Sequence, residues 1–342
     1  MKAVRIMRPG ELRVVDETKP VLDGENNVLI RMTAAGICGS DVGIYHGTNA
    51  AATYPRIIGH EIVGVVEETG TGVTAVHKGD RVIVDQVTAC GHCYACRKGR
   101  PNVCGNLKVR GVHIDGGYRQ WIAVPEDKCY LLPDSISDTD AIMIEPTTIA
   151  IQSCSRAELS EEDTLLLIGV GALGSSILKI ARLHCKNIIV ADVVEEKLDE
   201  ALERGARWKV NIAREDLEAK VREYTDGYGA TVTIDAACTK DSLMNALKCT
   251  GNAGRVVTMG FSVADTVVNQ FVITSKELDV RGSRLQNRKF GEAIELLKSG
   301  QIDLNGAVSH TFKLTDAQKA FDFIDSRDPS IRKIALTFED LD

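Results

Sequence analysis

The stretch from Leu165 to Asp192 limits most strongly what this 342-residue chain can fold into. It opens with a short apolar run, Leu165–Ile168, which is the pattern of a strand buried on both faces. A G-x-G-x-x-G sequence follows at Gly169–Gly174, with apolar residues at helical spacing behind it. A second apolar run, Ile188–Val190, ends at Asp192. The stretch is therefore predicted to be a strand–helix–strand unit that binds a dinucleotide.

Each part of this unit has a physical role in binding a dinucleotide. Gly169 allows the tight turn, Gly171 lets a pyrophosphate approach the backbone, and Gly174 lets the helix pack closely on the strand. The helix N-terminus would hold the phosphates, and Asp192 would accept hydrogen bonds from the adenosine ribose hydroxyls. The alternative is a structural glycine turn in some other βαβ unit. The expected cofactor-binding residues are Gly169, Gly171, Ala172, Leu173, Gly174, Asp192 and Lys197.

The cofactor is expected to be NAD rather than NADP. Asp192 would repel a 2′-phosphate, and the two residues that follow, Val193 and Val194, supply no cation to neutralise one. Lys197 is the nearest cation and would soften this preference.

Composition excludes several classes of partner. The net charge of −7 argues against nucleic acid or an anionic membrane. No apolar run approaches the roughly 18 residues of a spanning helix, and the charged N-terminal segment lacks the apolar core of a signal peptide. The chain is therefore expected in the cytoplasm, where its ten cysteines suggest metal binding before disulfides.

The fold class is predicted to be α/β, because two kinds of pattern divide the chain. Up to about residue 145, short β runs alternate with glycine-rich turns, which predicts a mostly antiparallel β domain. From about residue 150 to 284, strands alternate with helices, which predicts a doubly wound parallel sheet. A helix at Phe290–Ser299 and a strand at Lys333–Phe338 are too small to bury a core alone, so they are expected to return to the first domain. The predicted domains are 149–284 for the dinucleotide and 1–148 with 285–342 for the β domain.

Four closely spaced cysteines form the most specific motif. They are Cys90, Cys93, Cys96 and Cys104. Within fifteen residues, four thiolates can converge on one tetrahedral ion, and their softness and geometry favour zinc. Sulfur fills every position, so this zinc is expected to be structural. Disulfides suit the cytosol poorly, a reactive thiol cluster gives no reason for the spacing, and His92 is expected to be a surface residue.

A second set of residue types that bind metals is dispersed along the chain. It contains Cys38, the pair His60-Glu61, and Glu145. Each has a plain alternative: a small buried thiol for Cys38, a hydrogen-bonded core histidine for His60, and a helix cap or ion-pair partner for Glu145. Spacing alone does not show that they meet.

In combination and in order, Gly59-His60-Glu61, the four-cysteine motif and the Gly169–Gly174 fingerprint resemble the zinc-dependent medium-chain dehydrogenase/reductase family. This family includes alcohol, sorbitol and threonine dehydrogenases. The resemblance covers essentially the whole chain. It implies a GroES-like fold for the β domain, a catalytic zinc that faces the nicotinamide across the interdomain cleft, and one structural and one catalytic zinc per chain.

Carried over by position, the resemblance implies that Cys38 and His60 bind the catalytic zinc. Glu61 matches an acid that is a ligand in sorbitol dehydrogenase-like members, and Glu145 matches the residue that completes the site. Which of these two glutamates binds at rest is left open. Three protein ligands leave a position for water or a substrate oxygen. A glutamate at 145, rather than a cysteine, resembles the polyol and threonine branches.

The mechanism implied by the resemblance is Lewis-acid activation of a substrate hydroxyl by zinc and hydride transfer to the nicotinamide. Ser40 matches the hydroxyl that passes the proton outward. Many relatives carry a histidine five residues after the zinc cysteine as the next relay member, whereas this chain has Gly43. Neither Tyr45 nor His46 is assigned as a replacement.

The stretch 281–290, RGSRLQNRKF, is the main pointer to the substrate. It resembles the G-S-R-L-N-x-x-x-F stretch of L-gulonate, L-galactonate and L-idonate 5-dehydrogenases. Arg284 is the candidate for a bidentate pair with a substrate carboxylate, and Gln286 and Asn287 are candidate hydroxyl partners. The alternative is a solvated basic loop. The expected reaction is reversible oxidation of a secondary hydroxyl of a sugar acid to a ketone, with a neutral polyol or a polyol phosphate as the alternative substrate.

Two other classes are weighed against this enzyme. The intact four-cysteine motif disfavours a zinc-free quinone-reductase-like protein, and the presence of Cys38, His60 and Glu145 disfavours a catalytically inactive binding relative. Relatives associate through the nucleotide domain, often by pairing strands near Val267–Val280. A homodimer or homotetramer is therefore expected by resemblance.

Overall fold

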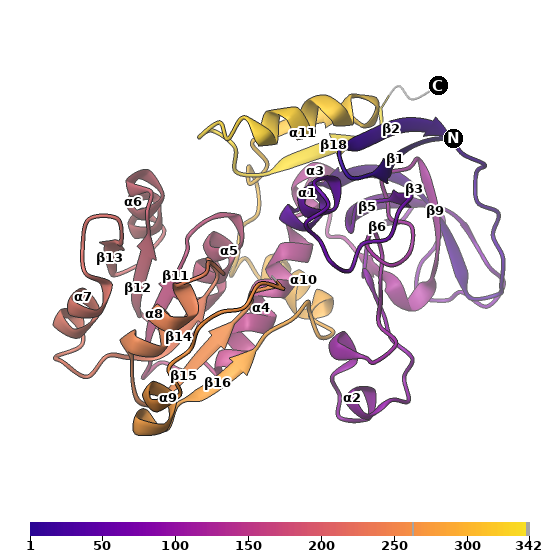
Figure 1. The fold of residues 1–342 in the computed structure, drawn as a ribbon. Helices are drawn as coiled ribbons and strands as arrows, with labels where there is room; N and C mark the ends of the chain where they lie inside the picture. The colour runs from indigo at the N-terminus through magenta and orange to yellow at the C-terminus, as the bar shows by residue number, and fades with distance from the viewer. Residues whose placement is uncertain (262, 340–342) are drawn as a thin grey trace. The chain divides into compact units, whose positions relative to one another are not determined.

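The chain forms two compact units in a computed structural model that describes residues 1–261 and 263–339 (Figure 1). The first unit contains Met1–Pro146 and Phe290–Asp342, and the second contains Thr147–Lys289. Residues 147–148 and 285–289, which the sequence assigns to the β domain, therefore belong to the second unit. Among the described residues, no helix combines the length and the apolar character needed to cross a bilayer.

The second unit is built on a six-stranded sheet in the order β13-β12-β11-β14-β15-β16, with every neighbouring pair parallel. Its strands are β11 (Thr164–Ile168), β12 (Asn187–Asp192), β13 (Trp208–Asn211), β14 (Ala230–Asp235), β15 (Thr250–Thr258) and β16 (Asp279–Gly282). After β11 the chain adds β12 and β13 on one side of that strand. It then crosses over and adds β14, β15 and β16 on the other side. The doubly wound parallel sheet predicted from the sequence is thus confirmed, and ligands bind such sheets beyond the carboxyl ends at this switch point.

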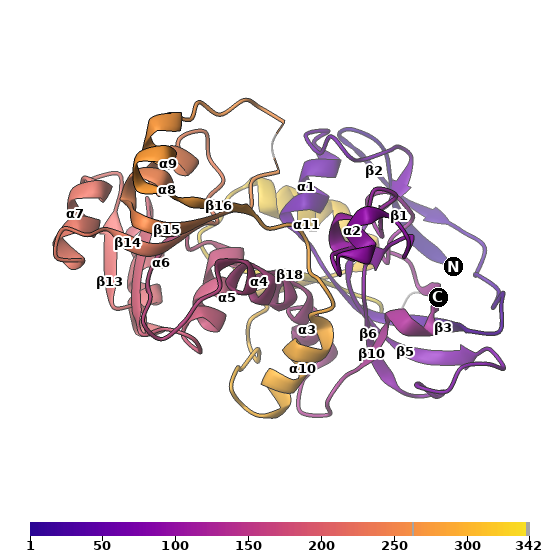
Figure 2. The ribbon, with the colours of Figure 1, turned by 90° about the horizontal axis from the view of Figure 1, so that it is seen from below.

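Helices cover both faces of this sheet (Figure 2). One face carries α5 (Ala172–Ala181) and α6 (Glu195–Glu203); the other carries α7 (Leu217–Tyr224), α8 (Ser242–Cys249) and α9 (Gln270–Lys276). Because both faces are covered, the central strand must be apolar throughout. Leu165–Ile168 accordingly are at most 1% exposed. The first apolar run of the sequence is therefore the centre of the second unit's core.

The first unit contains three β-sheets. The largest has the order β10-β6-β5-β3-β18-β17, with β9 also paired to β3; the smaller ones are β2-β1-β4 and β7-β8. The strands are β1 (Lys2–Arg8), β2 (Glu11–Asp16), β3 (Asn27–Gly36), β4 (Arg56–Ile57), β5 (Glu61–Thr69), β6 (Arg81–Val84), β7 (Val87–Thr88), β8 (Lys108–Val109), β9 (Trp121–Pro125), β10 (Cys129–Leu131), β17 (His310–Lys313) and β18 (Ile334–Thr337). All pairs in these sheets are antiparallel except β17 with β18, as predicted for a mostly antiparallel domain.

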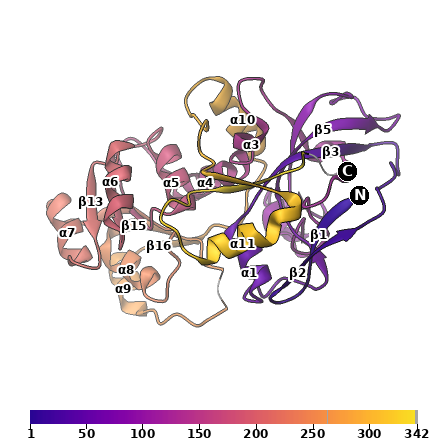
Figure 3. The ribbon, with the colours of Figure 1, turned by 90° about the horizontal axis from the view of Figure 1, so that it is seen from above.

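The C-terminal tail completes the first unit. Strand β18 pairs antiparallel with the end of β3 and so joins the largest sheet of the first unit. Helix α10 (Phe290–Lys298) matches the predicted helix, but α11 (Ala317–Asp325) was not predicted. Helix α11 lies beside α1 (Gly39–Tyr45) in Figure 3, and the rings of Tyr45 and Phe321 are 5.1 Å apart between them. Only three of its apolar positions are buried, which leaves a weak pattern in the sequence.

Candidate functional site

Asp41 joins the two segments that carry Cys38 and His60. Cys38 lies between the end of β3 and the start of α1, and its backbone N–H donates to Asp41 Oδ2 at 3.0 Å. The other oxygen of the same carboxylate accepts from the backbone N–H of Gly59 at 3.2 Å. Asp41 is fully buried, so these hydrogen bonds are shielded from water. Sequence reasoning missed Asp41; its only signal is an acid three residues after the cysteine.

Cys38, His60 and Glu61 each place one ligand atom within 4.8 Å of the others. His60 turns Nδ1 toward Asp41 Oδ1 at 3.5 Å, while its Nε2 lies 3.5 Å from the Ser40 hydroxyl. A carboxylate behind one ring nitrogen orients the other nitrogen toward a metal. The structure therefore brings three predicted ligands and Ser40 together.

The charge balance around His60 suits a cation. Burial alone would lower the pKa of His60, but the carboxylate of Asp41 and the thiol of Cys38 raise that pKa well above its ordinary value. Surroundings that stabilise positive charge on a buried ring also stabilise a metal ion, which competes with the proton for the same nitrogen. A thiol, an imidazole and a carboxylate form a donor set that zinc accepts.

Glu61 is held by Lys333, a residue that sequence reasoning did not single out. The Lys333 ammonium contacts both carboxylate oxygens and donates to Oε1 at 2.6 Å. Both residues are buried, at 1% exposure for Glu61 and 7% for Lys333. A Cβ on Gly36 would lie only 2.0 Å from Glu61 Oε2, so a larger residue there would displace this carboxylate. Lys333 precedes β18, and only the pairing of β18 with β3 brings it to this site.

Glu145 is close enough to His60 and Glu61 to interact with them electrostatically, but it is not a member of the group of three. It begins α4 (Ile144–Ala157), is 3% exposed, and accepts a hydrogen bond from the side-chain amide of Gln86. Burial raises the pKa of Glu145 to about 7; nearby His60 lowers the pKa and Glu61 raises it. The two candidate glutamates thus have different partners, a cation for Glu61 and a neutral amide for Glu145.

The four cysteine sulfurs form a compact cluster around α2 (Tyr94–Arg97), in a lobe that extends away from the strands of the first unit (Figure 1). The sulfur separations are 3.5 Å for Cys93–Cys96, 3.8 Å for Cys93–Cys104 and 3.4 Å for Cys90–Cys104. Sulfurs about 2.3 Å from a tetrahedral zinc would be about 3.8 Å apart. His92 is exposed and its ring lies 2.8 Å from the Cys90 carbonyl, so it stays outside the cluster.

Backbone amides prepare the lobe for a metal. Hydrogen bonds from the N–H groups of Cys96 and Gly105 lower the pKa of Cys93 to about 6. Those from His92 and Cys93 lower the pKa of Cys90. Burial raises the pKa of Cys96 to about 12. Because zinc binds thiolates, a lobe in which two thiols ionise readily can accept the ion, and the ion then ionises the others.

The glycine fingerprint has the contacts expected of a dinucleotide site. A Cβ on Gly174 would lie 1.9 Å from the carbonyl oxygen of Gly169, so close helix–strand packing requires glycine there. At Gly171, by contrast, no described atom lies within 4 Å of a built Cβ. That open space is what a pyrophosphate needs next to the first turn of α5, which begins at Ala172 and Leu173.

Asp192 lies beside this turn at the end of β12. Its Oδ2 accepts from the Val170 N–H at 2.8 Å, and its Oδ1 accepts from the N–H groups of Val193 and Val194 at 2.8 and 3.1 Å. These bonds fix the carboxylate and leave one lone pair, on Oδ2, for a further donor. Lys197 is exposed on α6.

The loop after β16 has an unusual backbone. Leu285 and Arg288 adopt positive φ angles of 50° and 57°, which side chains with a Cβ rarely adopt. Arg284 stacks its guanidinium 4.9 Å from the centre of the Phe261 ring. Gln286 is 2% exposed, and its Oε1 already accepts from the Lys289 N–H at 2.8 Å. Arg284, Gln286 and Asn287 belong to the second unit, whereas the Cys38–His60–Glu61 group belongs to the first.

The side chains near Gly43 turn toward α11. His46 Nε2 lies 2.9 Å from Asp325 Oδ1, and the Tyr45 hydroxyl accepts from Gln318 at 3.1 Å. These contacts direct both side chains toward α11, and we assign neither residue as a replacement for the missing relay histidine.

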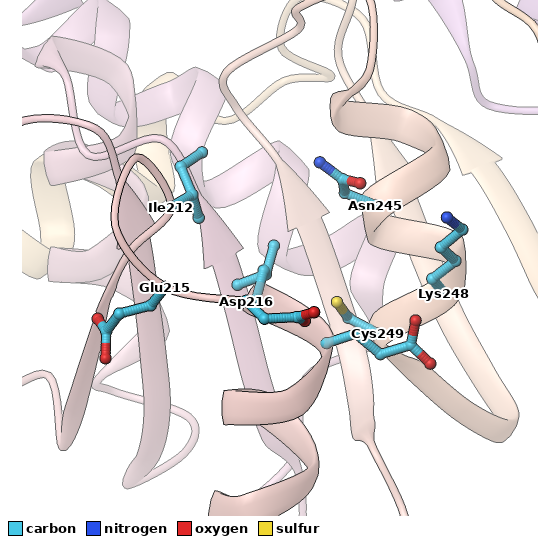
Figure 4. A pocket seen from close by; sticks show the side chains of 8 residues that line it. Ile212, Glu215, Asp216, Asn245, Lys248 and Cys249 are labelled. Atoms are coloured by element: carbon cyan, nitrogen blue, oxygen red, sulfur yellow. The ribbon is translucent and has the colours of Figure 1, made fainter.

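A separate hollow of about 290 Å³ lies between α7 and α8 (Figure 4). Asp216 uses its carboxylate to cap the Ala219 N–H at 2.9 Å. Burial, with a smaller contribution from the nearby Glu218, raises the pKa of the Cys249 thiol to about 12. A helix cap and a protonated thiol carry no catalytic chemistry, so we assign none to this hollow.

Comparisons with known proteins agree with both units. Residues 24–134 match the family described as alcohol dehydrogenase GroES-like domain, and residues 169–299 match zinc-binding dehydrogenase. The starvation-sensing protein RspB of Escherichia coli K12 is 39% identical over 342 residues, covering 99% of this chain and 100% of RspB. Sorbitol dehydrogenase of Bacillus subtilis is 30% identical over 329 residues, covering 94% of this chain and 93% of that protein.

A solved structure shows the same fold. The RspB crystal structure from E. coli CFT073, in complex with NADH, has a TM-score of 0.93 and 38% sequence identity, and covers 99% of both chains. The predicted fold class, a GroES-like β domain with a dinucleotide-binding α/β domain, is confirmed. The chain belongs to the zinc-containing alcohol dehydrogenase family of medium-chain dehydrogenases.

Proposed function

We propose that this enzyme reversibly oxidises a secondary hydroxyl of a sugar acid, a hexonate such as L-gulonate, L-galactonate or L-idonate, to a ketone with NAD. The convergence of Cys38, His60 and Glu61 is the observation that carries the dehydrogenase chemistry. The proposal that the substrate is an acid rests on the loop that contains Arg284. The reaction is placed in the cytoplasm, where thiols stay reduced and can bind zinc.

Cys38, His60 and Glu61 are the proposed ligands of the catalytic zinc, and Cys90, Cys93, Cys96 and Cys104 those of the structural zinc. When bound, the catalytic zinc supplies a Lewis acid and NAD supplies the hydride acceptor. Asp41 holds the His60 ring in orientation through Nδ1, and Lys333 holds the Glu61 carboxylate. The Ser40 hydroxyl, 3.5 Å from His60 Nε2, is placed to take the proton that leaves the substrate.

NAD is the proposed cofactor because the Asp192 carboxylate is fixed beside the glycine turn and would repel a 2′-phosphate. The related RspB was crystallised with NADH. We expect kcat/KM to be at least about 100-fold higher with NAD than with NADP, which corresponds to roughly 2.7 kcal/mol. Equal activity with both cofactors would contradict the assignment of Asp192.

An acid substrate is favoured by the geometry of Arg284. Its planar guanidinium can bind a carboxylate with two parallel hydrogen bonds, and its stacking on Phe261 restricts the side chain. The two left-handed residues, Leu285 and Arg288, store strain, as backbones at binding sites often do. The alternative substrate is a neutral polyol, which the 30% identity with a sorbitol dehydrogenase supports, or a polyol phosphate.

A substrate panel separates these alternatives. Hexonates, neutral polyols and polyol phosphates are compared by NADH formation for the wild type, Arg284→Ala and Arg288→Ala. We expect hexonates to be preferred and Arg284→Ala to lower kcat/KM for them by about 10- to 100-fold, since truncation leaves the carboxylate unpaired. Arg288→Ala, which removes one charge from the same loop, controls for general attraction. Activity only with neutral polyols would refute the sugar-acid proposal.

The enzyme is proposed to be a homodimer or homotetramer that associates through the second unit. Strand β16 is the last strand of its sheet, so its outer edge carries unpaired backbone groups. Val267, Phe271 and Val280 expose 86%, 73% and 42% of their surface. Sedimentation analysis should give a multiple of the chain mass, and Val280→Lys should shift it toward the monomer. A monomeric wild type would contradict this proposal.

A further inference from the structure

Gln86 is a buried glutamine in a segment with a fixed backbone. It lies between β6 and β7 and is 1% exposed. Its carbonyl oxygen accepts from the Arg110 N–H at 3.0 Å, and the preceding Asp85 is anchored by its N–H to Lys128 O at 2.8 Å. These backbone bonds fix the position from which the side chain extends. Its Nε2 donates to Glu145 Oε1, 59 residues further along the chain.

The two glutamates near His60 have different hydrogen-bond partners. Glu61 is grouped with Cys38 and His60 and has Lys333 behind it. Glu145 is as deeply buried, yet it is not a member of that group. A carboxylate oxygen that accepts an amide N–H gives part of its lone-pair density to that donor and is fixed in direction. Gln86 therefore restrains the carboxylate that would otherwise compete with Glu61.

The other end of the Gln86 amide is available as a hydrogen-bond acceptor. Its Oε1 is buried and makes no hydrogen bond to any described atom. A buried acceptor without a partner is costly, and native proteins usually satisfy it with protein, water or ligand. In this amide, Nε2 is committed to Glu145, so Oε1 is left as an acceptor for a hydroxyl that enters the same site.

We propose that Gln86 is a positioning residue whose amide holds Glu145 outside the Cys38–His60–Glu61 set, so that Glu61 rather than Glu145 is the third protein ligand of the metal. The inference deepens the proposed function and depends on it. Glu145 then serves as a hydrogen-bonding carboxylate next to the metal position. Glu61 remains the third protein ligand of the metal, and Lys333 balances the charge of the Glu61 carboxylate.

Cobalt substitution at the catalytic site provides a readout that is independent of turnover, because the visible absorption of Co(II) depends on its ligands and coordination number. Gln86→Leu removes the amide while keeping most of the volume. Without the amide, Glu145 is expected to reach the metal and change the Co(II) spectrum. We also expect kcat to fall by about 10- to 100-fold, the usual range when a residue that holds the metal ligands in place is replaced. KM for NAD should stay within about twofold, because the dinucleotide residues are not touched.

Two further variants separate positioning from general damage. Gln120→Leu removes a glutamine that accepts from the Lys2 N–H at 2.6 Å in the same unit, and it should leave the Co(II) spectrum unchanged. In a Glu145→Gln background, Gln86→Leu should have little further effect on kcat, because the group through which it acts is already altered. An unchanged Co(II) spectrum in Gln86→Leu, or full additivity of the two substitutions, would overturn the inference.

Glu145→Gln keeps the proposal testable even if Gln86→Leu does not fold. This variant should retain its full zinc content, whereas Glu61→Gln should lose the catalytic ion; loss of zinc from Glu145→Gln would show that Glu145 is the ligand. A wild type that binds only the structural zinc would refute the proposed function itself. If the wild type binds both zinc ions and is an active dehydrogenase, but Gln86→Leu leaves the Co(II) absorption spectrum unchanged, only the role of Gln86 is refuted.

Discussion

The two units build their sites in opposite ways. In the second unit, the proposed dinucleotide site comes from one continuous stretch, in which Gly171, Gly174 and Asp192 follow a single strand–helix–strand path. In the first unit, the metal group and its supports come from residues 38–41, 60–61 and 333, which meet only through β3, β5 and β18. The continuous site relies on close backbone packing, and the dispersed site relies on buried charges that balance one another.

The largest effect is expected at the centre of the dispersed site. His60→Ala removes one of three converging ligands and should lower kcat/KM by about 10³-fold or more, roughly 4 kcal/mol. Zinc content should fall from near two ions to near one, since the two metal groups are separate. Atomic absorption and steady-state assays give both values. The control is His92→Ala, an exposed ring in the cysteine lobe. If His92→Ala lost as much activity, the assignment of the two sites would be wrong.

Removing the charge behind Glu61 should have the next largest effect. Lys333→Met leaves a buried carboxylate without its cation and should destabilise the metal-free protein by about 3–5 kcal/mol in urea unfolding. Zinc should recover part of this loss, because the ion also balances the carboxylate. Lys19→Met, which breaks an exposed pair with Glu67, should cost less than about 1 kcal/mol. Equal costs for the two lysines would mean that burial does not distinguish these ion pairs.

In the continuous site, added side-chain volume should have a larger effect than a change of charge. Gly174→Ala forces a Cβ against the Gly169 carbonyl and should destabilise the protein by about 1–3 kcal/mol, seen as a lower Tm. Gly171→Ala meets no described atom and should leave Tm unchanged while weakening NADH binding, as measured by fluorescence titration. If Gly171→Ala bound NADH normally, the pyrophosphate would not lie over this turn.

The smallest effect is expected at a charge network in the second unit. Asp163 is hydrogen-bonded by Thr231 and Ser160 and paired with Arg255. Burial would raise the pKa of Asp163, but these partners lower it below its ordinary value. A lowered folded-state pKa gives stability that is present above about pH 4 and is lost as the pH falls through the folded-state value.

Asp163→Asn should therefore destabilise the protein at pH 7 by about 1 kcal/mol, because asparagine keeps an acceptor oxygen for these donors, and the difference from wild type should shrink on acidification below about pH 4. Urea unfolding at pH 3, 5 and 7 checks this. Asp16→Asn, at an exposed pair with Lys2, serves as the control and should change little. A difference that grew toward low pH would contradict the direction of the pKa shift.

The same contrast explains what could be predicted from the sequence. The alternation of strands and helices, the glycine turn, Asp192 and the cysteine lobe follow from neighbours along the chain, because spacing and periodicity report local geometry. Cys38, His60 and Glu61 were placed together only by resemblance, and the structure brings them together. Asp41, Gln86 and Lys333 went unnoticed because their partners are 18, 59 and 272 residues away. No local pattern marks a side chain whose function depends on so distant a contact.

The position of Lys333 has a consequence for biosynthesis. A ribosome would make Cys38, His60 and Glu61 early, then the entire second unit, and only afterwards the segment that carries Lys333 and β18. The nucleotide-binding unit can fold as soon as its own residues have emerged, because domains fold as units during synthesis. The metal group therefore acquires its balancing cation only after the whole second unit has been synthesised, so Glu61 lacks its contact with Lys333 while that unit folds.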